Sequence, residues 1–160
     1  MPTDKVTNAI VAGLGGQGVL RAAETVAAVA FAAGLDVKKS EIHGMSQRGG
    51  SVMCDVRFGP EVWSPMVPPG EADFLVVLAP DQVEVNRWRL RAGGVLIAPE
   101  AAAGVVLADK RSLNMALLGV FSRHLPFPAE AWTAVIRGQF AEKAAAANAA
   151  AFTAGRAAAH

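Results

Sequence analysis

The chain has 160 residues, enough for a substantial hydrophobic core, and we expect a single domain over residues 1–160. Apolar residues make up 52% of it and charged residues only 18%, against roughly 25% charged in an average soluble domain. This composition predicts apolar surface that a partner chain covers, and the formal net charge of +1 excludes the strongly basic surface typical of nucleic-acid or anionic-membrane binding.

Neither a membrane span nor a metal cluster is expected. No unbroken apolar run reaches the ~18–20 residues that cross a bilayer, and residues 1–5 are polar, without a signal-peptide core. We therefore expect a cytoplasmic protein. Cys54 is the only cysteine, so this sequence cannot supply the thiolates of an iron–sulfur cluster or a structural zinc site. Its apolar, alternating surroundings favour a buried small side chain over a reactive thiol.

The first part of the chain predicts three strands and one helix. An apolar run over residues 7–12 is typical of a buried strand, and residues 16–33 form an apolar, alanine-rich helix that Gly34 ends in a left-handed conformation. Strands follow at residues 36–42 and 51–58, the second with alternating apolar side chains. Because a glycine-containing loop and no helix separates these two strands, we expect a departure from simple strand–helix–strand winding here.

The second part predicts further strands, then helices. Residues 59–70 are a proline-rich connection in which Trp63 is either a lid on the core or a contact for a partner. Elements are expected as strands at 73–78, 95–98 and, briefly, 105–107, and as helices at 82–91, at 114–125, from Pro128 and from about residue 139. The last helix is so rich in alanine that it should pack on the domain or on a neighbour. The predicted class is α/β: a Rossmann-like, mostly parallel sheet flanked by helices, with C-terminal helices.

A glycine turn follows the first strand. Gly13, Gly15 and Gly18 satisfy the pattern G-x-G-x-x-G, which in doubly wound sheets permits a tight turn and a close approach of backbone to phosphate. The helix that follows would present unpaired N–H groups to an anion. The same glycines are also needed for packing in folds that bind nothing, so this pattern alone leaves ligand binding open.

A second segment, residues 43–50, is polar and glycine-containing and has little to bury. Its composition predicts an ordered loop shaped to contact something. His43 stands beside this loop, and we expect it to position a neighbour through a hydrogen bond rather than to act as a general base, because no carboxylate or nucleophile is paired with it in the sequence. No catalytic constellation is visible anywhere in the chain.

Together the two segments, Gly-x-Gly-Gly-Gln-Gly-Val and His-Gly-Met-Ser-Gln-Arg-Gly-Gly-Ser-Val, resemble the gamma-type subunit or domain of the 2-oxoacid:acceptor oxidoreductases, and most closely the beta subunit of indolepyruvate oxidoreductase. The resemblance runs over residues 8–80, with a weaker echo at residues 113–119. The positions that match the family motif, and that we expect to face an active centre, are Gly13, Gly15, Gly16, Gln17, Gly18, His43, Gly44, Met45, Ser46, Gln47, Arg48, Gly49 and Gly50.

The resemblance implies a structural or site-completing component, not a catalyst on its own. In that family a partner chain carries thiamine diphosphate and iron–sulfur clusters, decarboxylates a 2-oxo acid and passes electrons to ferredoxin, and the acyl group usually leaves on coenzyme A. The resemblance therefore implies no cofactor bound by this chain alone and leaves a contact with coenzyme A open, as it does self-association of the isolated chain. Indolepyruvate or another aryl pyruvate is the substrate it suggests. The chain is short for the family, apparently around residues 101–110.

Three other classes stay open on the residues themselves. A free-standing NAD(P)- or FAD-dependent reductase would use the turn at Gly13–Gly18 with Glu41 gripping a ribose. An ATP-dependent adenylating domain uses a similar turn but needs phosphate-handling charges that are missing here. A non-enzymatic scaffold subunit would fit the lack of catalytic residues.

Overall fold

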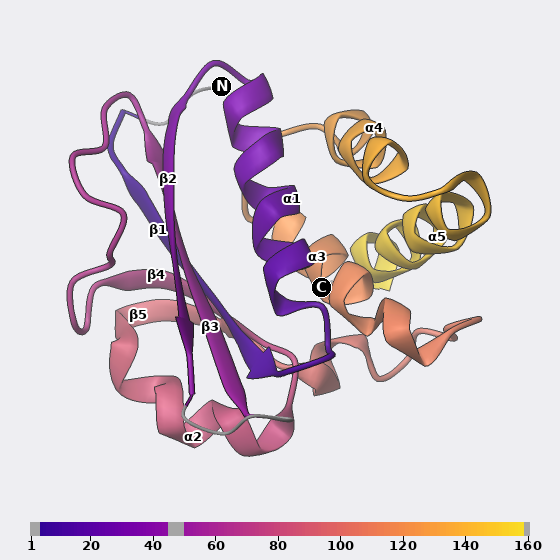
Figure 1. Ribbon diagram of the computed structural model, residues 1–160, viewed down its shortest axis with the longest axis horizontal. Helices are drawn as coiled ribbons and strands as arrows, with labels where there is room; N and C mark the ends of the chain where they lie inside the picture. The colour runs from indigo at the N-terminus through magenta and orange to yellow at the C-terminus, as the bar shows by residue number, and fades with distance from the viewer. Residues whose placement is uncertain (1–3, 45–49, 159–160) are drawn as a thin grey trace.

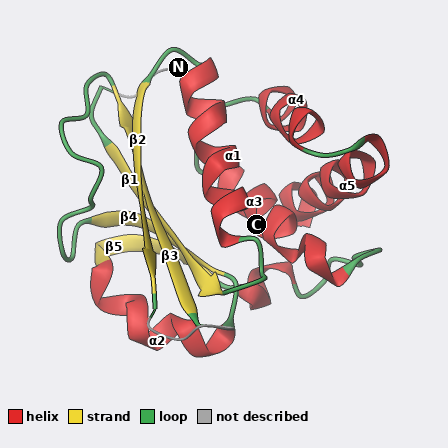
Figure 2. Ribbon diagram, viewed as in Figure 1, coloured by secondary structure: helices red, strands yellow, loops and turns green. Residues whose placement is uncertain are grey.

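The fold is built on one five-stranded sheet in a computed structural model that describes residues 4–44 and 50–158 (Figures 1 and 2). The strand order is β2-β3-β1-β4-β5. In chain order the strands are β1 (Thr7–Leu14), β2 (Asp36–His43), β3 (Ser51–Gly59), β4 (Ala72–Val77) and β5 (Leu90–Ile97). The α-helices are α1 (Val19–Ala32), α2 (Val83–Asn86), α3 (Leu113–Ser122), α4 (Ala129–Gln139) and α5 (Glu142–Ala158).

Strand β3 gives the sheet its mixed character. It pairs antiparallel with both β1 and β2, whereas β1 and β4, and β4 and β5, pair in parallel. The other four strands therefore share one direction, which confirms the mostly parallel α/β class. The predicted departure from simple winding is confirmed too: β2 returns directly into β3 as a hairpin, and β3 is inserted between β1 and β2.

Helices α1 and α3 pack against one face of the sheet, and α4 and α5 pack on the outside of these two helices (Figure 1). The main core lies between this helical layer and the sheet, and its aromatic part is formed by α3, α4 and α5 with the segments between them. Trp132 stacks on Phe152 at 5.6 Å between ring centroids and meets Phe121 edge-on at 6.3 Å. As predicted, the residue after the α1 cap is Gly34, with a φ of 89°.

The alanine-rich helix α5 packs on the domain, and glycines make this possible. A Cβ at Gly155 would overlap the carbonyl oxygen of Ala116 on α3, and one at Gly119 would overlap that of Phe152 on α5. The two helix backbones therefore approach each other closely, as small residues allow.

The other face of the sheet is covered by the proline-rich connection between β3 and β4, by α2 and by the segment that follows α2. A smaller apolar cluster lies beneath this cover, formed by Ile10, Ala12, Val67, Ala72, Leu75 and Val77. Trp63 takes no part in it: its side chain is 85% exposed, so the interpretation of Trp63 as a lid on the core is wrong, and a contact with a partner stays a prediction.

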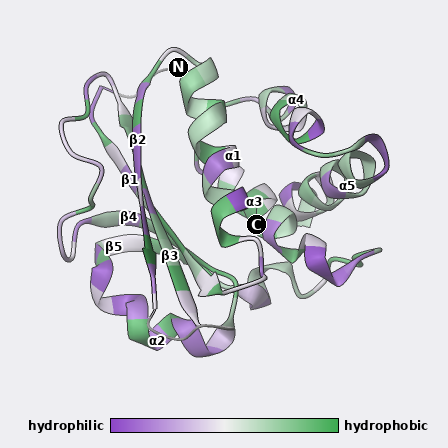
Figure 3. Ribbon diagram, in the orientation of Figure 1, coloured by the Kyte–Doolittle hydropathy of each residue, from purple (hydrophilic) through white to green (hydrophobic). Residues whose placement is uncertain are grey.

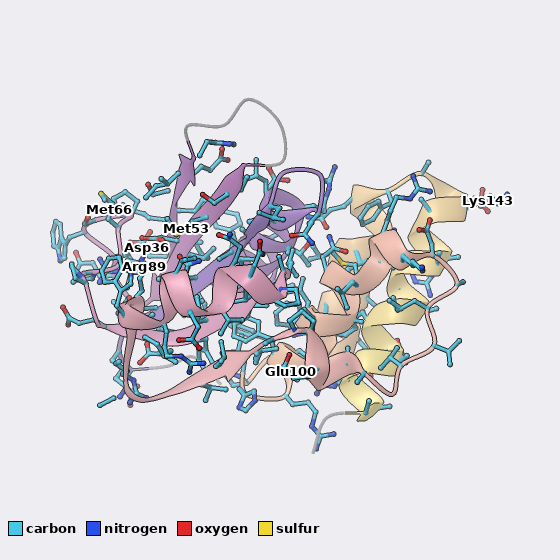
Figure 4. All side chains as sticks on the ribbon, turned by 90° about the horizontal axis from the view of Figure 1, so that it is seen from below. Asp36, Met53, Met66, Arg89, Glu100 and Lys143 are labelled. Atoms are coloured by element: carbon cyan, nitrogen blue, oxygen red, sulfur yellow. The ribbon has the colours of Figure 1, made fainter. Side chains whose placement is uncertain are left out.

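A buried ion pair fastens this outer cover to the sheet. Arg89, which follows α2, donates from one guanidinium nitrogen to both carboxylate oxygens of Asp55 on β3, each at 3.0 Å. Asp55 also accepts from the backbone N–H of Val67 at 2.9 Å. Arg89 and Met53 lie at the same end of the molecule, near Met66 of the connection (Figure 4).

Two predicted elements are corrected. The helix expected at 82–91 is a 3-10 turn (Pro80–Gln82), the short helix α2 and a second 3-10 turn (Arg87–Arg89), and β5 already begins at Leu90. Strand β5 passes through Gly93, whose φ is 78°, with an irregular register against β4, so Gly93 lies within an edge strand. The strand expected at 105–107 is irregular backbone, because no neighbouring strand is available to pair with it.

Apolar side chains remain on the surface, as the composition predicts. Central strands and much of α1 are drawn in the hydrophobic colour (Figure 3), but several large apolar side chains lie outside the core. The most exposed are Phe31, Trp63, Met66, Val85, Trp88 and Val106. That a partner covers them stays a prediction. Among the described residues no helix is both long and apolar enough to cross a membrane.

Candidate functional site

The candidate site lies where β1 ends and α1 begins. Gly16 and Gly18 both adopt positive φ angles, 87° and 79°, which side chains with a Cβ rarely tolerate. The turn closes when the backbone N–H of Gln17 donates to the carbonyl of Leu14 at 3.2 Å. The predicted strand–glycine turn–helix arrangement is therefore confirmed.

The side chain of Gln17 holds this turn together. Its Oε1 accepts from the backbone N–H of Leu14 at 2.7 Å, and its Nε2 donates to the carbonyl of Leu78, just after β4, at 3.3 Å. A Cβ on Gly13 would lie 2.9 Å from both Gln17 Oε1 and Val19 Cγ2. Gly13 and Gln17 thus join β1, α1 and β4, which is a packing role.

Asn114, at the start of α3, completes the turn from a distant part of the chain. Its Nδ2 donates to the carbonyl of Gly18 at 3.2 Å, and a Cβ on Gly18 would overlap that amide. Asn114 is only 5% exposed. Asn114 was not predicted to belong to the site; the available signal was an amide residue inside the otherwise apolar segment 113–118.

The β2–β3 hairpin brings the second predicted segment to the same place. Within the hairpin, Gly44 N–H donates to Ser51 O at 2.6 Å, and Gly15 N–H donates to the carbonyl of Gly50 at 2.9 Å. The two glycine segments are therefore bonded to each other at the carboxyl end of β1, the central strand of the sheet. Five candidate residues lie outside the described part of the chain: Met45, Ser46, Gln47, Arg48 and Gly49.

His43 and Glu41 lie on the helix side of the edge strand β2. His43 Nε2 stands 3.6 Å from a carboxylate oxygen of Glu41, and both side chains are largely exposed. The sequence had shown no carboxylate paired with His43, and this proximity supplies one. For the dinucleotide alternative the geometry is unfavourable, because β3 separates β2, and with it Glu41, from β1 and the glycine turn.

Three pockets surround the glycine turn. One, of about 280 Å³, lies between α1 and the hairpin and is lined by Gly15, Leu20 and His43 among others. A second, of about 210 Å³, opens between the turn, Leu78 and Lys110. The third, of about 320 Å³, lies between the starts of α1, α3 and α5, with a polar wall formed by Arg21, Asp109, Arg111, Ser112, Asn114 and Asn148. Of these lining residues, only those of the glycine turn and His43 were predicted.

Cations dominate the walls of these pockets. Arg21 pairs with Glu24 at 3.8 Å and lies 5.2 Å from the centre of the Phe140 ring. Arg111 binds Asp109 through its guanidinium, which lowers the pKa of that carboxyl group. Lys110 is exposed, and within residues 4–44 and 50–158 no ion pair is found for it. The first turn of α1 contains no acidic residue, so the edge of the sheet here favours an anion.

The described residues around the glycine turn include no group suited to redox or nucleophilic chemistry. Within the part of the chain that the structure describes, no three His, Cys, Asp or Glu side chains come together as a metal site would require. Cys54 is 1% exposed, and burial raises the pKa of its thiol to about 11. It is a buried small side chain, as predicted. The arrangement can bind and position, but the described residues contain no nucleophile with an adjacent base.

Curated relatives match part of the chain. It is 46% identical over 94 residues to indolepyruvate oxidoreductase subunit IorB of Thermococcus kodakarensis, a match that covers 58% of this chain and 46% of the relative. The corresponding subunit of Archaeoglobus fulgidus is 48% identical over 73 residues, which is 46% of this chain and 36% of the relative. The chain therefore matches less than half the length of these curated relatives.

Solved structures share the fold at low sequence identity. A 2-oxoglutarate:ferredoxin oxidoreductase from Magnetococcus marinus superposes with a TM-score of 0.84 at 22% identity, over 98% of this chain and 31% of that one. The gamma subunit of a keto/oxoacid ferredoxin oxidoreductase from Geobacter sulfurreducens gives 0.80 at 21% identity, over 96% of this chain and 98% of that one. A pyruvate oxidoreductase subunit from Thermotoga maritima gives 0.67 at 22% identity, over 94% and 95%.

The family match extends beyond the segments that first suggested it. Residues 8–158 fit the family described as pyruvate ferredoxin/flavodoxin oxidoreductase, which includes the helices α3 to α5 that follow the two glycine segments. On this evidence, the chain belongs to the pyruvate ferredoxin/flavodoxin oxidoreductase family.

Proposed function

We propose that the chain is the site-completing subunit of a 2-oxoacid:ferredoxin oxidoreductase and contributes no catalytic residue of its own. A partner chain carrying thiamine diphosphate and iron–sulfur clusters would perform the oxidative decarboxylation to an acyl-CoA, with ferredoxin as electron acceptor. The observation that carries the proposal is the hydrogen bond between Gly15 and Gly50, which unites the two glycine segments at the carboxyl end of β1. The lack of a catalytic constellation among the described residues agrees with it.

The substrate we propose is an aryl pyruvate such as indolepyruvate. The curated relatives that this chain resembles are indolepyruvate oxidoreductase subunits. Specificity would lie mainly on the thiamine-binding chain, with the hairpin segment 43–50 facing the active centre.

We propose that the pockets beside the glycine turn contact coenzyme A. The Magnetococcus neighbour was solved with 2-oxoglutarate, coenzyme A and succinyl-CoA bound. In this chain, Arg21, Lys110 and Arg111 flank the start of α1, where the N–H groups of the first helical turn have no hydrogen-bond partner among the described residues. Phosphate groups suit this combination of cations and backbone donors. Since Asp109 already binds Arg111 and Glu24 lies 3.8 Å from Arg21, we expect Lys110 to contribute most.

A lysine substitution tests the coenzyme A contact in the assembled enzyme. Lys110→Ala should raise the KM for coenzyme A about tenfold, the effect of removing one charge-assisted contact, while kcat changes little. Lys143→Ala is the matched control, because Lys143 is exposed at the far end of the molecule from β2 and β3 (Figure 4) and is absent from the lining of these pockets. Equal KM values for both variants would refute the contact.

Isolation from the source organism tests the subunit role itself. The tagged chain, purified gently and without oxygen, should appear in native mass spectrometry with a larger, cysteine-rich chain that holds thiamine diphosphate and iron–sulfur clusters. A chain that emerges without such a partner and carries a bound nucleotide would instead support the dinucleotide-binding alternative.

The hairpin segment can be tested in the same complex. Arg48→Ala should impair turnover of the assembled enzyme while the isolated chain stays folded by circular dichroism. Unchanged turnover would argue against a site role for residues 43–50.

A further inference from the structure

The two edges of the sheet differ in regularity. Edge strand β5 contains a register irregularity and the positive-φ residue Gly93, which disturb pairing along its outer side. Edge strand β2 is regular: it pairs with β3 without a shift, from Asp36 opposite Gly59 to His43 opposite Val52. Its outer side therefore presents regularly spaced backbone donors and acceptors over eight residues. Such an edge can accept another strand.

The side chains of β2 divide between the two faces of the sheet. Lys39 and Glu41 stand opposite Val56 and Cys54 of β3, which belong to the main core, so both point to the helix side. Lys39 lies 3.6 Å from Glu24 of α1, in agreement with this direction. Their side chains remain 35% and 42% exposed, so both can reach across the open edge.

We propose that β2 pairs with β2 of a second copy of this chain, antiparallel about a two-fold axis at Ser40. A two-fold axis perpendicular to the sheet makes one continuous sheet with both helical layers on the same side, so helix-side residues must oppose helix-side residues. When the axis lies at Ser40, Lys39 of each copy stands opposite Glu41 of the other. Two reciprocal ion pairs result.

The neighbouring registers are unfavourable. Moving the axis to Lys39 places the two copies of Lys39 opposite each other, and moving it to Glu41 does the same for Glu41. Like charges directly opposite each other on neighbouring strands destabilise pairing. The charge pattern thus favours one register over its two neighbours. Charges that only protect an edge strand from pairing would not favour any register.

Apolar surface beside β2 supports the same arrangement. A shallow groove of about 270 Å³ lies along α1 and β2, lined by Ala27, Phe31 and Val37 among others, and Phe31 is 72% exposed. With the axis at Ser40, Val37 stands opposite His43 of the second copy. The apolar end of α1, which contains Phe31, would then be removed from water by the second copy.

Cysteine cross-linking of the whole chain tests the register. Opposite Cα atoms in an antiparallel pair are about 4.5–5.5 Å apart, within the range of a disulfide. Ser40→Cys should therefore form a covalent dimer readily. The native Cys54 is 1% exposed and does not compete.

Two further cysteine variants serve as controls. Lys38→Cys and Ile42→Cys should not cross-link alone, because each residue is then about 13 Å from its own copy. Mixed with each other they should, since Lys38 stands opposite Ile42 of the second copy. Absence of the Ser40→Cys dimer, or equal cross-linking of all three variants alone, would overturn the proposal.

Charge reversal tests the ion pairs by sedimentation. Lys39→Glu and Glu41→Lys should each raise the dimer Kd about tenfold or more, because each variant places two like-charge pairs across the interface. An equimolar mixture of the two should restore a dimer with one copy of each. Glu24→Gln controls for the neighbouring contact of Lys39.

Other outcomes decide against the second copy. A wild-type chain that stays monomeric, or variants that the mixture does not rescue, would overturn the proposal and favour a strand from another protein as occupant of this edge. Because both tests use this chain alone, they stand apart from the proposed function.

Discussion

Gly18 combines a conformational and a packing requirement. Gly18→Ala should destabilise the fold by roughly 2–3 kcal/mol, because an L residue is strained at a φ of 79° and because the new Cβ would displace the amide of Asn114. Gly16→Ala is the matched control: its φ is 87°, but its Cβ would meet open space. It should cost only about 1–2 kcal/mol. Urea unfolding measures both, and equal costs would show that Asn114 adds nothing.

Cys54 predicts a specific dependence of stability on pH. Burial raises the pKa of its thiol from 9.0 to about 11, so the folded state holds the proton more tightly than the unfolded state. The stability that the protonated, buried thiol contributes is fully present below pH 9 and is lost as the pH rises toward 11. The free energy of unfolding should therefore fall less steeply across this window for Cys54→Ala than for the wild type. Parallel curves would mean that the thiol is not buried in solution.

At the residue scale, local sequence patterns identify the glycine turn but not all of the residues that contact it. Gly13, Gly15 and Gly18 follow a recognisable spacing, whereas Asn114 lies 96 positions after Gly18. A contact across that separation depends on where α3 packs, and no local pattern records it. Similarly, Lys110 is one of several lysines in the sequence until the fold places it beside the turn.

At the scale of elements, the crossing of α3 and α5 depends on glycine. Gly155→Ala should destabilise the protein by about 1–3 kcal/mol or more, because its Cβ would overlap the carbonyl of Ala116 and force the helices apart. Gly138→Ala on α4, where a Cβ meets open space, should instead stabilise by about 0.5–1 kcal/mol through helix propensity. Thermal unfolding distinguishes the two. A similar gain for both variants would contradict the close crossing.

Element types were largely predictable, and their boundaries less so. Strand β4 is an unbroken apolar run and β3 alternates apolar with polar side chains, so both can be identified from the sequence. A strand buried on both faces is apolar throughout, whereas a strand buried on one face alternates. The predicted helix at 82–91 fails for a tertiary reason: Leu90 already pairs with Ala72 of β4. The strand expected at 105–107 lacks a partner in the sheet.

At the scale of the whole molecule, the pair of Asp55 and Arg89 binds the outer cover to the sheet. Asp55→Asn should destabilise the fold by about 3–5 kcal/mol, because it leaves the buried guanidinium without its counter-charge. Limited proteolysis should then cleave the connection between β3 and β4 faster, since Val67 N–H bonds the same carboxylate. Glu84→Gln, which neutralises the carboxylate of a surface pair with Arg87, is the control and should cost little. Comparable losses of stability in the two variants would show that the pair of Asp55 and Arg89 does not fasten the outer cover to the sheet.

The sequence by itself determined the α/β class, the glycine turn, the departure from simple strand–helix–strand winding between β2 and β3, and the family. These depend on periodicity, on glycine at required backbone angles and on motif spacing, all of which are local. Only the tertiary structure decided that β3 separates β2 from β1, that Gly15 bonds Gly50, and that Asn114 and Lys110 reach the turn. It also showed that β2 is an open, regular edge with Lys39 and Glu41 on one face. Such features depend on which elements pack together, and packing energy is summed over the whole core, so a local pattern cannot specify them.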